Sequence, residues 1–459
     1  MQRALWRALL PACALLIPRP APAVPRPPRD DLVHAVDSLA QASLRDGPVA
    51  GMSIALVRGS DVILAKGYGY ADLENEVPAT QHTVYRIGSI TKQFTAGAIL
   101  QLAEQGQLRL DDEITRYLPG YDTHGYRITI RQLLNHTSGI RGFTEVSAFQ
   151  GRDRLDLSPD SMLALFQHEP LDFVPGTGYV YSNSAYYLLA RIIQRVSGQS
   201  YGNYLREHVF MPLGLNETYS CDDAPIISHR ARGYTFGEGE LQNAPYLSML
   251  PPTGGGSICS TVLDLVTWTR ALAEGRFISH ASYAQMTTPL SLPDGRILGY
   301  GYGLAISTLA GHLEIAHAGT ISGFSGYSAF YPRDSITVVV LCNTLGPVFP
   351  GLLARAIARR ALSVPVESPK RIPLSPDERA RVVGTYGAGR LQIAVSDVRD
   401  TLKVNDLFFD EVYLYQGHDV FASARNPEIR AVFSGRGRHA DRLVLDMAGL
   451  RVYDVVRAP

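Results

Sequence analysis

The strand-like segments of this sequence form two groups far apart in the chain, and this separation restricts the possible folds most. The first group is a hairpin, in which residues 51–58 and 62–70 alternate apolar and other side chains around a turn at 59–61. The second group starts only near Tyr300, and residues 89–275 show mainly helical and loop patterns. Its strands are expected at 301–307, 313–316, 327–331 and 336–342.

A sheet made from both groups brings the two ends of this region together. Amphipathic helices are expected beside the sheet at residues 30–45 and 350–361. The predicted class is therefore α/β (α+β), with an antiparallel sheet flanked by helices and a helical insert between the two halves of the sheet.

A proline-rich stretch separates a second hydrophobic pattern from the first. Residues 363–379 carry four prolines among charged side chains, which is typical of a linker. Residues 380–459 contain short strand-like runs at close spacing, which predicts a small all-β domain resembling a barrel or a sandwich. We expect residues 30–362 and 380–459 to fold independently. A chain ending near Val366 should then retain every candidate site residue named below.

The amino terminus has the features of a secretory signal peptide over residues 1–23. Two arginines precede an apolar run at 8–17, and Ala21-Pro22-Ala23 is a small-residue cleavage site. A proline-rich spacer follows at 24–29. The apolar run is shorter than the roughly 20 residues of a spanning helix, and apolar residues continue after Cys13, which disfavours a lipid anchor there. Export to the periplasm or the medium is expected, with no transmembrane segment.

Composition and cysteine content exclude several other classes. Lys plus Arg and Asp plus Glu both number 43 and no basic stripe occurs, so no nucleic-acid partner is expected. The absence of CxxC and HExxH motifs gives a metal site no support, and we expect no cofactor. Three cysteines follow the signal, so at most one disulfide can form. Cys342 ends an apolar run and is expected to be a buried thiol, while pairing of Cys221 with Cys259 and the oligomeric state are left open.

A hydroxyl and an amine stand close together at the start of a predicted helix. Apolar residues recur every four positions from Ile90, and Gly106 is a stop signal after them. Ser89 then lies in the first turn, and Lys92 projects on the same side about one turn later. The unpaired N–H groups of that turn favour an oxyanion beside Ser89. The pair alone is weak evidence, because an N-cap serine followed by a solvated lysine is common.

Two other segments supply groups that a nucleophilic serine needs. Tyr181 lies in a loop before a helix at 186–197, and its phenol is a candidate general base if a nearby ammonium lowers its pKa; the alternative is an aromatic packed on the helix. His317, Gly319 and Thr320 lie at a strand end. Gly319 permits close approach of a substrate, the next N–H can donate to an oxyanion, and His317 can bond the substrate or Tyr181. A strand-end histidine is otherwise more often structural.

A third polar segment, Leu133-Leu134-Asn135-His136-Thr137-Ser138-Gly139, is interpreted differently. We predict a structural turn near the cleft rather than a catalytic element.

Ser89-Ile90-Thr91-Lys92, Tyr181-Ser182-Asn183 and His317-Ala318-Gly319 together resemble, in this order, the three signature elements of the β-lactamase-related serine hydrolases in their class C branch. That family includes penicillin-binding proteins and D-aminopeptidases. The resemblance spans about residues 30–362 and implies the β-lactamase/transpeptidase-like, penicillin-recognising fold. The tail, with Gly384-Thr385-Tyr386, resembles the lipocalin-like C-terminal domain of some of these peptidases.

The resemblance also implies a role for each matching residue. Ser89 is the acylated nucleophile, Lys92 and Tyr181 share its deprotonation, and Asn183 hydrogen-bonds the substrate amide. The N–H groups of Ser89 and Thr320 form the oxyanion hole. His317 replaces the lysine of true class C β-lactamases, and in this it resembles certain D-alanyl-D-alanine carboxypeptidases and D-aminopeptidases.

We therefore expect an exported hydrolase that acts through an acyl-serine on peptide or peptide-like amides, with D-amino-acid-containing peptides favoured. An esterase or a β-lactamase would use the same site, so those alternatives stay open. A non-catalytic penicillin-binding sensor is disfavoured, because a binder needs no activated nucleophile. An α/β-hydrolase lipase would need a G-x-S-x-G elbow, which the chain lacks.

Overall fold

The computed structural model describes residues 27–458 except for short gaps at 347–348, 366–367, 389–390, 399–400, 406–409, 425–426 and 448–449. The predicted signal peptide at 1–23, Cys13 and the proposed truncation point Val366 lie outside the described residues.

The larger domain is built on a sheet of seven strands in the order β11-β12-β13-β14-β1-β2-β3. Its central pair joins the two chain ends, because β1 runs antiparallel to β14 with Met52 opposite Cys342 and Arg58 opposite Ile336. The prediction of one antiparallel sheet from both strand groups is thus confirmed. The strands are β1 (Gly51–Arg58), β2 (Asp61–Asp72), β3 (Val77–Pro78), β11 (Ala305–Leu309), β12 (His312–Ile321), β13 (Phe324–Tyr331) and β14 (Ile336–Cys342).

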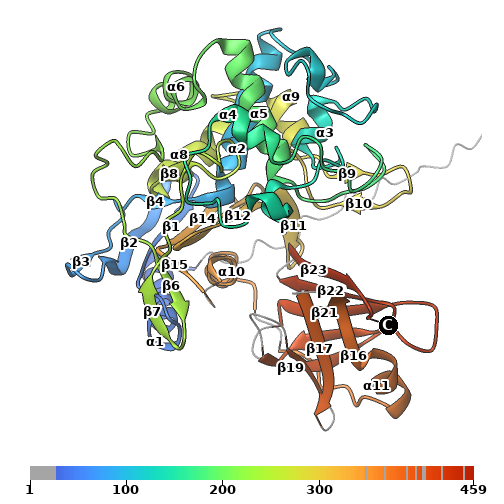
Figure 1. Ribbon diagram of the computed structural model, residues 1–459. Helices are drawn as coiled ribbons and strands as arrows, with labels where there is room; N and C mark the ends of the chain where they lie inside the picture. The colour runs from blue at the N-terminus through green and yellow to red at the C-terminus, as the bar shows by residue number, and fades with distance from the viewer. Residues whose placement is uncertain are drawn as a thin grey trace, which may run out of the picture.

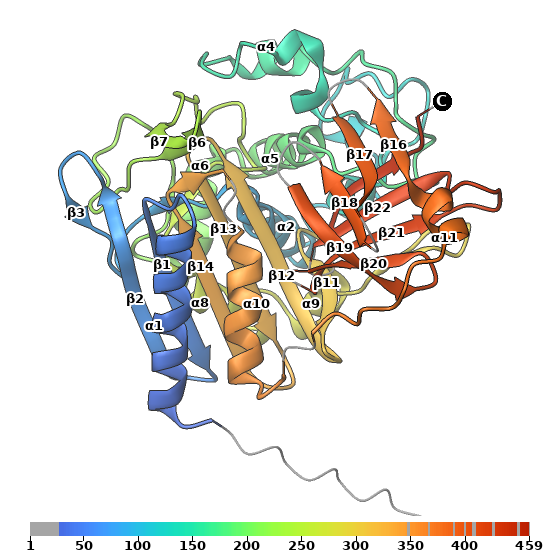
Figure 2. The ribbon, with the colours of Figure 1, turned by 90° about the horizontal axis from the view of Figure 1, so that it is seen from below.

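Helices cover both faces of this sheet. On one face lie α1 (Arg29–Asp46) and α10 (Pro350–Ala361), close to the predicted positions (Figure 2). On the other lie α2 (Thr91–Glu104) and α8 (Val262–Ala273), where Phe94 stacks on Trp268 with ring centres 4.2 Å apart. Almost every residue of β1 is buried, because the strand is central and covered on both sides.

The predicted strand at 301–307 begins later, at Ala305. Residues 301–304 form a turn instead, in which Gly301 N donates to Leu304 O at 2.9 Å. Gly303 has a φ of 66°, and a Cβ there would lie 2.6 Å from the backbone oxygen of Lys92. The glycines therefore serve close packing against the start of α2 rather than a strand.

In the sequence the helical insert comes between the two halves of the sheet, as expected, and in space it lies on the side of the sheet that carries α2 and α8 (Figure 1). Its helices include α3 (Ile130–Leu134), α4 (Pro159–Ala164), α5 (Asn183–Ser197), α6 (Tyr201–Leu205), a π-helical turn (Arg206–Phe210), α7 (Met211–Leu213) and α9 (His280–Met286). Three small sheets accompany it. The first contains β4 (Tyr85–Arg86), β8 (Ile258–Ser260) and β5 (Tyr219–Ser220), and the second contains β15 (Thr344–Leu345), β6 (Tyr234–Gly237) and β7 (Glu240–Asn243). The third pairs β9 (Leu290–Ser291) with β10 (Ile297–Leu298).

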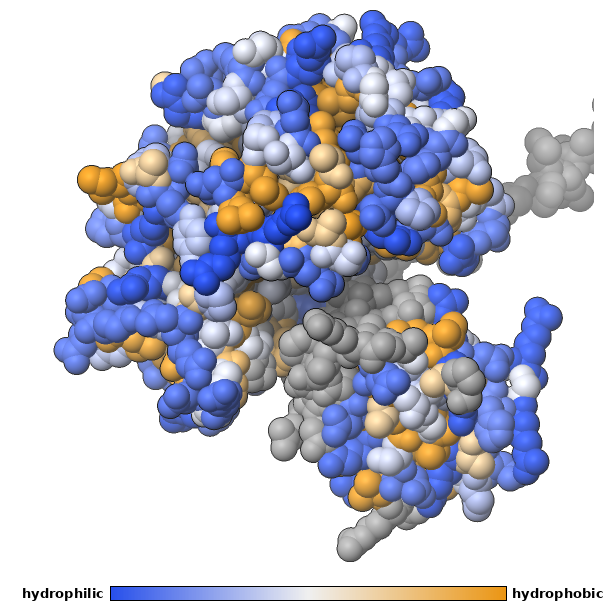
Figure 3. Space-filling view, viewed as in Figure 1, coloured by the Kyte–Doolittle hydropathy of each residue, from blue (hydrophilic) through white to orange (hydrophobic). Residues whose placement is uncertain are grey.

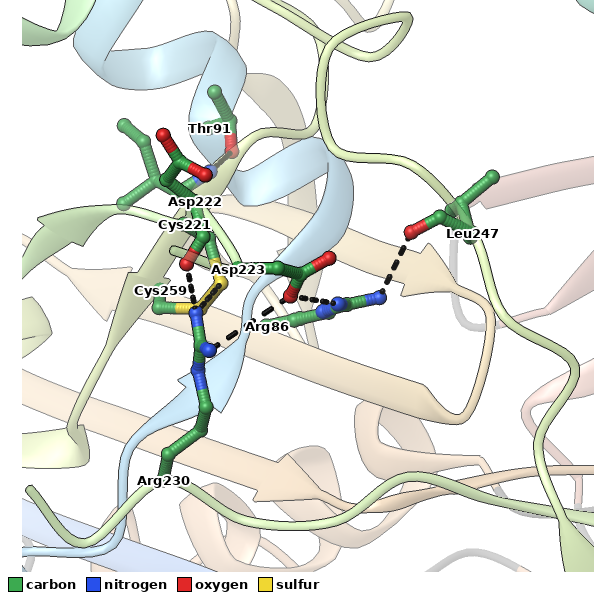
Figure 4. Close-up of a disulfide and its surroundings, with 9 residues drawn as sticks. Arg86, Thr91, Cys221, Asp222, Asp223, Arg230, Leu247 and Cys259 are labelled. Atoms are coloured by element: carbon green, nitrogen blue, oxygen red, sulfur yellow. Dashed lines mark hydrogen bonds and ion pairs between the residues drawn. A yellow bond between two sulfur atoms is a disulfide. The ribbon is translucent and has the colours of Figure 1, made fainter. Parts of the chain in front are cut away.

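One disulfide links Cys221 to Cys259, with Cα atoms 5.1 Å apart (Figure 4). Cys342 is a buried free thiol. The limit of one disulfide and the buried thiol are both confirmed, and the structure decides the pairing that the sequence left open.

The second domain is an antiparallel meander of eight strands that nearly closes into a barrel. Its first and last strands meet where Tyr386 bridges Arg457 and where Ala458 N donates to Thr385 O at 2.9 Å. The barrel prediction is confirmed. The strands are β16 (Gly384–Ala388), β17 (Leu391–Val398), β18 (Thr401–Asn405), β19 (Asp410–Gly417), β20 (Val420–Ser423), β21 (Ile429–Ser434), β22 (Arg442–Met447) and β23 (Leu450–Val456).

The end of the predicted linker is helical rather than irregular. Helix α11 (Pro376–Val382) begins with a capping box between Ser375 and Glu378. Pro376 suits this place because proline at the first helical position lacks only an N–H that would be unpaired anyway. Proline was therefore a start signal at this position.

The two domains pack together through α10 (Figures 1 and 2). Leu352 on that helix packs against the apolar core of the barrel. Arg355 and Arg359 place guanidinium nitrogens 3.1 and 2.6 Å from the carboxylate of Glu428 in the barrel. Independent folding of the two domains stays a prediction, and this contact determines what truncation would expose.

The described part of the chain has no helix long and apolar enough to cross a membrane. Hydrophilic residues cover most of the face in Figure 3, with a band of hydrophobic residues across the larger domain. No group of three metal-binding side chains occurs among the described residues.

Candidate active site

Ser89 lies in a 3₁₀ turn (Gly88–Ile90) that leads directly into α2. Gly88 has a φ of 50°, and a Cβ there would lie 2.7 Å from the backbone nitrogen of Thr320. A Cβ on Gly319 would clash with the backbone oxygen of Ile87. Two glycines therefore let β12 approach the serine turn closely, which brings the backbone of Thr320 next to that of Ser89.

Lys92 is the best-connected polar side chain of the site. It is 0% exposed, and its Nζ lies 3.1 Å from Ser89 Oγ, 2.9 Å from Asn183 Oδ1 and 2.9 Å from the backbone oxygen of Gly255. Burial lowers its pKa to about 7, and the charge of Glu145 opposes this shift. Near neutral pH, a large fraction of this amine is therefore unprotonated.

The contacts of Lys92 fit that neutral amine. Asn183 Oδ1 and Gly255 O can only accept, so they take up two N–H groups. The remaining lone pair then faces Ser89 Oγ, which carries a proton. The arrangement thus places an amine that can act as a base within hydrogen-bond distance of the Ser89 hydroxyl.

Tyr181 lies on the other side of this pair. The centre of its ring is 4.7 Å from Lys92 Nζ, and its hydroxyl is hydrogen-bonded to Ser89. Burial raises its pKa above the ordinary value, and the bond to Ser89 opposes the rise only in part. The expectation that an ammonium would lower this pKa is wrong, because burial of the phenol dominates and raises it. Tyr181 therefore stays protonated and can pass a proton on.

His317 is placed at the site, but its partners differ from those expected. Its Nε2 lies 2.9 Å from the hydroxyl of Tyr300 and its Nδ1 2.5 Å from the backbone oxygen of Ala318. Its ring centre is 6.3 Å from that of Tyr181. Burial, together with the charge of Lys92, lowers its pKa to about 3, so the ring is neutral. His317 thus bonds Tyr300 in place of Tyr181.

Asn183, the first residue of α5, connects Lys92 to the cleft. Its Oδ1 accepts from Lys92, and its Nδ2 donates to Thr144 Oγ1 at 3.2 Å. Thr144 in turn donates to Glu145 Oε1 at 2.8 Å. A substrate amide would have to share or replace the bond to Thr144.

The strand that carries Thr320 has an open edge beside the serine. β11 pairs with β12 only as far as Ala316. Within the described part of the chain no strand pairs with residues 317–321 on that side. Alternate backbone groups there point away from β13, so an extended substrate can add as a further strand.

The predicted turn at 133–139 lies at the cleft, and His136 in it does more than shape the loop. Its Nδ1 accepts from Ser182 N at 3.1 Å, and its backbone oxygen accepts from Val180 N at 3.3 Å. These two bonds hold the residues on both sides of Tyr181. His136 also has a left-handed φ of 62°.

Several residues of the site were not identified from the sequence. Tyr300, Gly255, Thr144 and Glu145 were not recognised as site residues, although each contacts or influences a predicted one. The signals were weak: Gly255 lies in a run of three glycines and Tyr300 in the segment Gly299-Tyr300-Gly301-Tyr302-Gly303. Such glycine-rich segments indicate close backbone approach but not its partner.

We expect His136→Ala to lower kcat by about a hundredfold while changing KM little, because a misplaced catalytic group costs roughly that factor. His136→Asn should lose less, because asparagine keeps an acceptor and tolerates a left-handed backbone. Steady-state kinetics on p-nitrophenyl acetate, with thermal melting of each variant, would measure this. His168→Asn, an exposed histidine, is the control. An unchanged kcat in folded His136→Ala would show that Tyr181 needs no such support.

Comparison with known proteins agrees with this geometry. Residues 36–362 match the family model described as Beta-lactamase. Penicillin-binding protein 4* from Bacillus subtilis (strain 168) is 32% identical over 308 residues, covering 63% of this chain and 67% of that protein. A D-aminopeptidase from Gluconobacter oxydans (strain 621H) is 27% identical over 343 residues, covering 74% of this chain and 63% of that protein. The chain thus matches about two thirds of the length of these relatives.

A solved structure is similar over both domains. The octameric penicillin-binding protein homologue from Pyrococcus abyssi has a TM-score of 0.66 and 27% identity, and the match covers 93% of this chain and 100% of that one. The combination of the sheet domain with a C-terminal barrel is therefore shared with that protein.

Proposed function

The chain belongs to the Beta-lactamase family, and from this premise we propose that it is an exported serine hydrolase that cleaves peptide or peptide-like amide bonds through an acyl-serine intermediate. D-amino-acid-containing peptides are the favoured substrates. The observation that carries the proposal is the triple contact of Lys92 Nζ with Ser89, Asn183 and Gly255. It supplies the nucleophile with a buried base whose pKa is lowered to about 7.

The proposed reaction has two steps. Ser89 Oγ attacks the substrate carbonyl while its proton passes to Lys92 Nζ, and the oxyanion is held by the N–H groups of Ser89 and Thr320. Tyr181 donates its proton to the leaving nitrogen and regains one from Lys92, so the C–N bond breaks and an amine leaves. Water then attacks the acyl-serine and gives one proton to Lys92 Nζ, which passes it to Ser89 Oγ as the C–O bond breaks and the acid leaves.

The preference for amides over esters rests on the relatives and on the protonated phenol. One matched relative is named a D-aminopeptidase. An amine is a poor leaving group and must be protonated as it departs, and the raised pKa of Tyr181 keeps a proton available for it. An esterase and a β-lactamase are the alternatives, since both would use the same Ser89 and Lys92.

A hydrolysis panel tests the proposed function. It would contain matched D- and L-aminoacyl amides, short p-nitrophenyl esters and nitrocefin, each with Ser89→Ala as the background control. We expect kcat/KM for at least one D-aminoacyl amide to exceed that for its L-enantiomer and for nitrocefin. Turnover of esters alone would favour the esterase hypothesis, and preferred turnover of nitrocefin would favour a β-lactamase.

We expect kcat/KM to rise about tenfold between pH 6 and 8, with an inflection near 7, because the unprotonated form of Lys92 is the active base. Neither buried imidazole competes for this inflection, since the pKa of His317 lies at about 3 and that of His136 well below its usual value. Initial rates on an uncharged p-nitrophenyl ester, corrected for the buffer rate, would measure the profile.

Glu145→Gln provides the matched control for that assignment. The charge of Glu145 raises the pKa of Lys92, so its removal should move the inflection to lower pH without abolishing activity. An inflection that disappears in Glu145→Gln would assign the titration to the carboxyl group and not to Lys92.

Export is supported by the cysteine chemistry. The Cys221–Cys259 disulfide suits an oxidising compartment, because cytosolic thiols are usually kept reduced. Cell fractionation that found the full-length, uncleaved chain only in the cytosol would contradict export.

A further inference from the structure

A cavity of about 570 Å³ lies beside the disulfide on the larger domain. Its walls combine charged and apolar side chains. The charged members are Arg86, Asp223, Arg230 and Arg232, and the apolar ones include Val84 and Phe324. The proposed acyl-transfer chemistry uses none of these side chains, so the cavity needs its own explanation.

The cavity adjoins the acyl-transfer site. Arg86 precedes Ser89 by three residues and Ser322 follows Thr320 by two, and both line the cavity. Consecutive Cα atoms are about 3.8 Å apart, so these residues lie within about 11 Å of Ser89 and about 8 Å of Thr320. Ile321, between Thr320 and Ser322, packs on the apolar cluster that contains Val84 and Cys259 of the cavity wall. A peptide of three or four residues is long enough to reach from one site to the other.

The lining carries an excess of positive charge. Three guanidinium groups face one carboxylate, that of Asp223. Figure 4 shows Asp223 between Arg86 and Arg230, beside the disulfide, and the nitrogen–oxygen distances are 3.0 and 3.7 Å. Arg232 has its nearest carboxylate partner, Glu74, only at 3.9 Å. One carboxylate cannot accept the hydrogen bonds of two guanidinium groups with five donors each.

One buried donor of this cluster has no acceptor among the described residues. Arg230 donates to the backbone oxygen of Asp222 through Nη2, but its Nε is buried and has no hydrogen-bond partner in that part of the chain. Burial lowers the pKa of Arg86, and the charge of Arg230 lowers it further, although Asp223 opposes the shift. A second anion in the cavity would complete the hydrogen bonds and offset this repulsion.

We propose that this cavity binds a carboxylate of the substrate while an adjoining peptide bond lies at Ser89. The planar guanidinium groups suit a carboxylate, and the apolar walls suit the carbon chain attached to it. The cavity then selects acidic peptides. This selection rests on the proposed function, because it assumes that the ligand is a peptide held at Ser89. The carboxylate belongs either to the C-terminus of the peptide or to an acidic side chain.

Equilibrium binding to the full-length Ser89→Ala protein tests the proposal without turnover. Two pairs of D-alanine-containing tetrapeptides would be titrated calorimetrically: one pair differs only in a C-terminal carboxylate or carboxamide, the other only in Glu or Gln within the chain. We expect the anionic member of at least one pair to bind about tenfold more tightly. The pair that responds identifies the source of the carboxylate.

Charge changes in the cavity should then act in opposite directions. Arg232→Gln, at a half-exposed side chain, should reduce the preference severalfold, and Arg230→Gln should abolish it. Asp223→Asn should increase it, because it leaves more guanidinium donors for the ligand. Arg206→Gln, an exposed arginine in the π-helical turn, is the matched control and should change nothing. Arg232→Gln remains informative if loss of the Arg230 bond to Asp222 unfolds that loop.

The same substitutions in the Ser89 background separate this proposal from the proposed function. Turnover of p-nitrophenyl acetate should be unchanged in Arg232→Gln. Equal affinity for both members of both pairs, or a preference that survives Arg232→Gln and Arg230→Gln, would overturn the carboxylate site while leaving the hydrolase in place. Absence of acylation in the unmodified protein would instead overturn the hydrolase.

Discussion

Ser89→Ala is expected to abolish covalent labelling by a fluorescent penicillin or a fluorophosphonate and to lower hydrolysis by a factor on the order of 10⁴ or more. Ser89 is the hydroxyl in hydrogen-bond contact with Lys92, and it lies in the turn that leads into α2, where its own N–H group is proposed to stabilise the oxyanion. Gel fluorescence and mass spectrometry of the labelled peptide would locate the adduct. Labelling that persists in Ser89→Ala would identify a different nucleophile.

Lys92→Ala and Tyr181→Phe extend this result to the proton transfer. Each should lower kcat strongly with the fold intact, because Lys92 Nζ and the Tyr181 hydroxyl both contact Ser89. The double variant should lose much less than the product of the two separate losses, since both groups act on one proton. Fully multiplicative losses would mean that the two side chains serve separate steps.

Arg355→Ala should lower the free energy of unfolding by about 3–5 kcal/mol, the usual cost of breaking a buried ion pair. The side chain of Arg355 is 4% exposed and that of its partner Glu314 is 0% exposed, with nitrogen and oxygen 3.5 Å apart. Glu314 also accepts from Tyr331 at 2.6 Å and from Ser307 at 2.8 Å. Without Arg355 the carboxylate would stay buried and lose its charge partner.

Thermal unfolding followed by circular dichroism would measure this loss. Arg206→Ala, which breaks an exposed pair, is the control and should cost only about 0–1 kcal/mol. Adding Glu314→Gln to Arg355→Ala should recover part of the loss, because it removes the unpaired charge. A melting temperature equal to that of the control would show that the pair contributes nothing.

The contact between α10 and the barrel predicts the behaviour of a chain that ends near Val366. Such a chain keeps Ser89, Lys92 and Tyr181 and should still be labelled by a penicillin. It loses Glu428, the barrel partner of Arg355, and exposes the apolar side chain of Leu352. We therefore expect it to melt at a lower temperature than the full chain.

The local patterns of the sequence predicted most of the secondary structure around the site. β1, β14 and α10 have the predicted limits, and α1 agrees within a residue at each end. The two helices could be predicted from the spacing of their apolar side chains, and the two strands from short runs of mainly apolar residues, since both faces of these strands are buried. Predicted boundaries were wrong where glycine or proline had another structural role. Gly303 allows close packing against α2, and Pro376 begins a helix.

By itself the sequence determined which groups could meet at the start of α2, because one helical turn fixes Ser89 and Lys92 on the same side. It also limited the cysteines to one disulfide. Only the tertiary structure decided that Tyr300 is the partner of His317, that Cys221 pairs with Cys259, and that Glu428 reaches α10 from another domain. These contacts join residues whose separation in the sequence does not predict their distance in space. The pKa of Lys92 belongs with them, because burial by distant segments removes the water that would keep the ammonium charged.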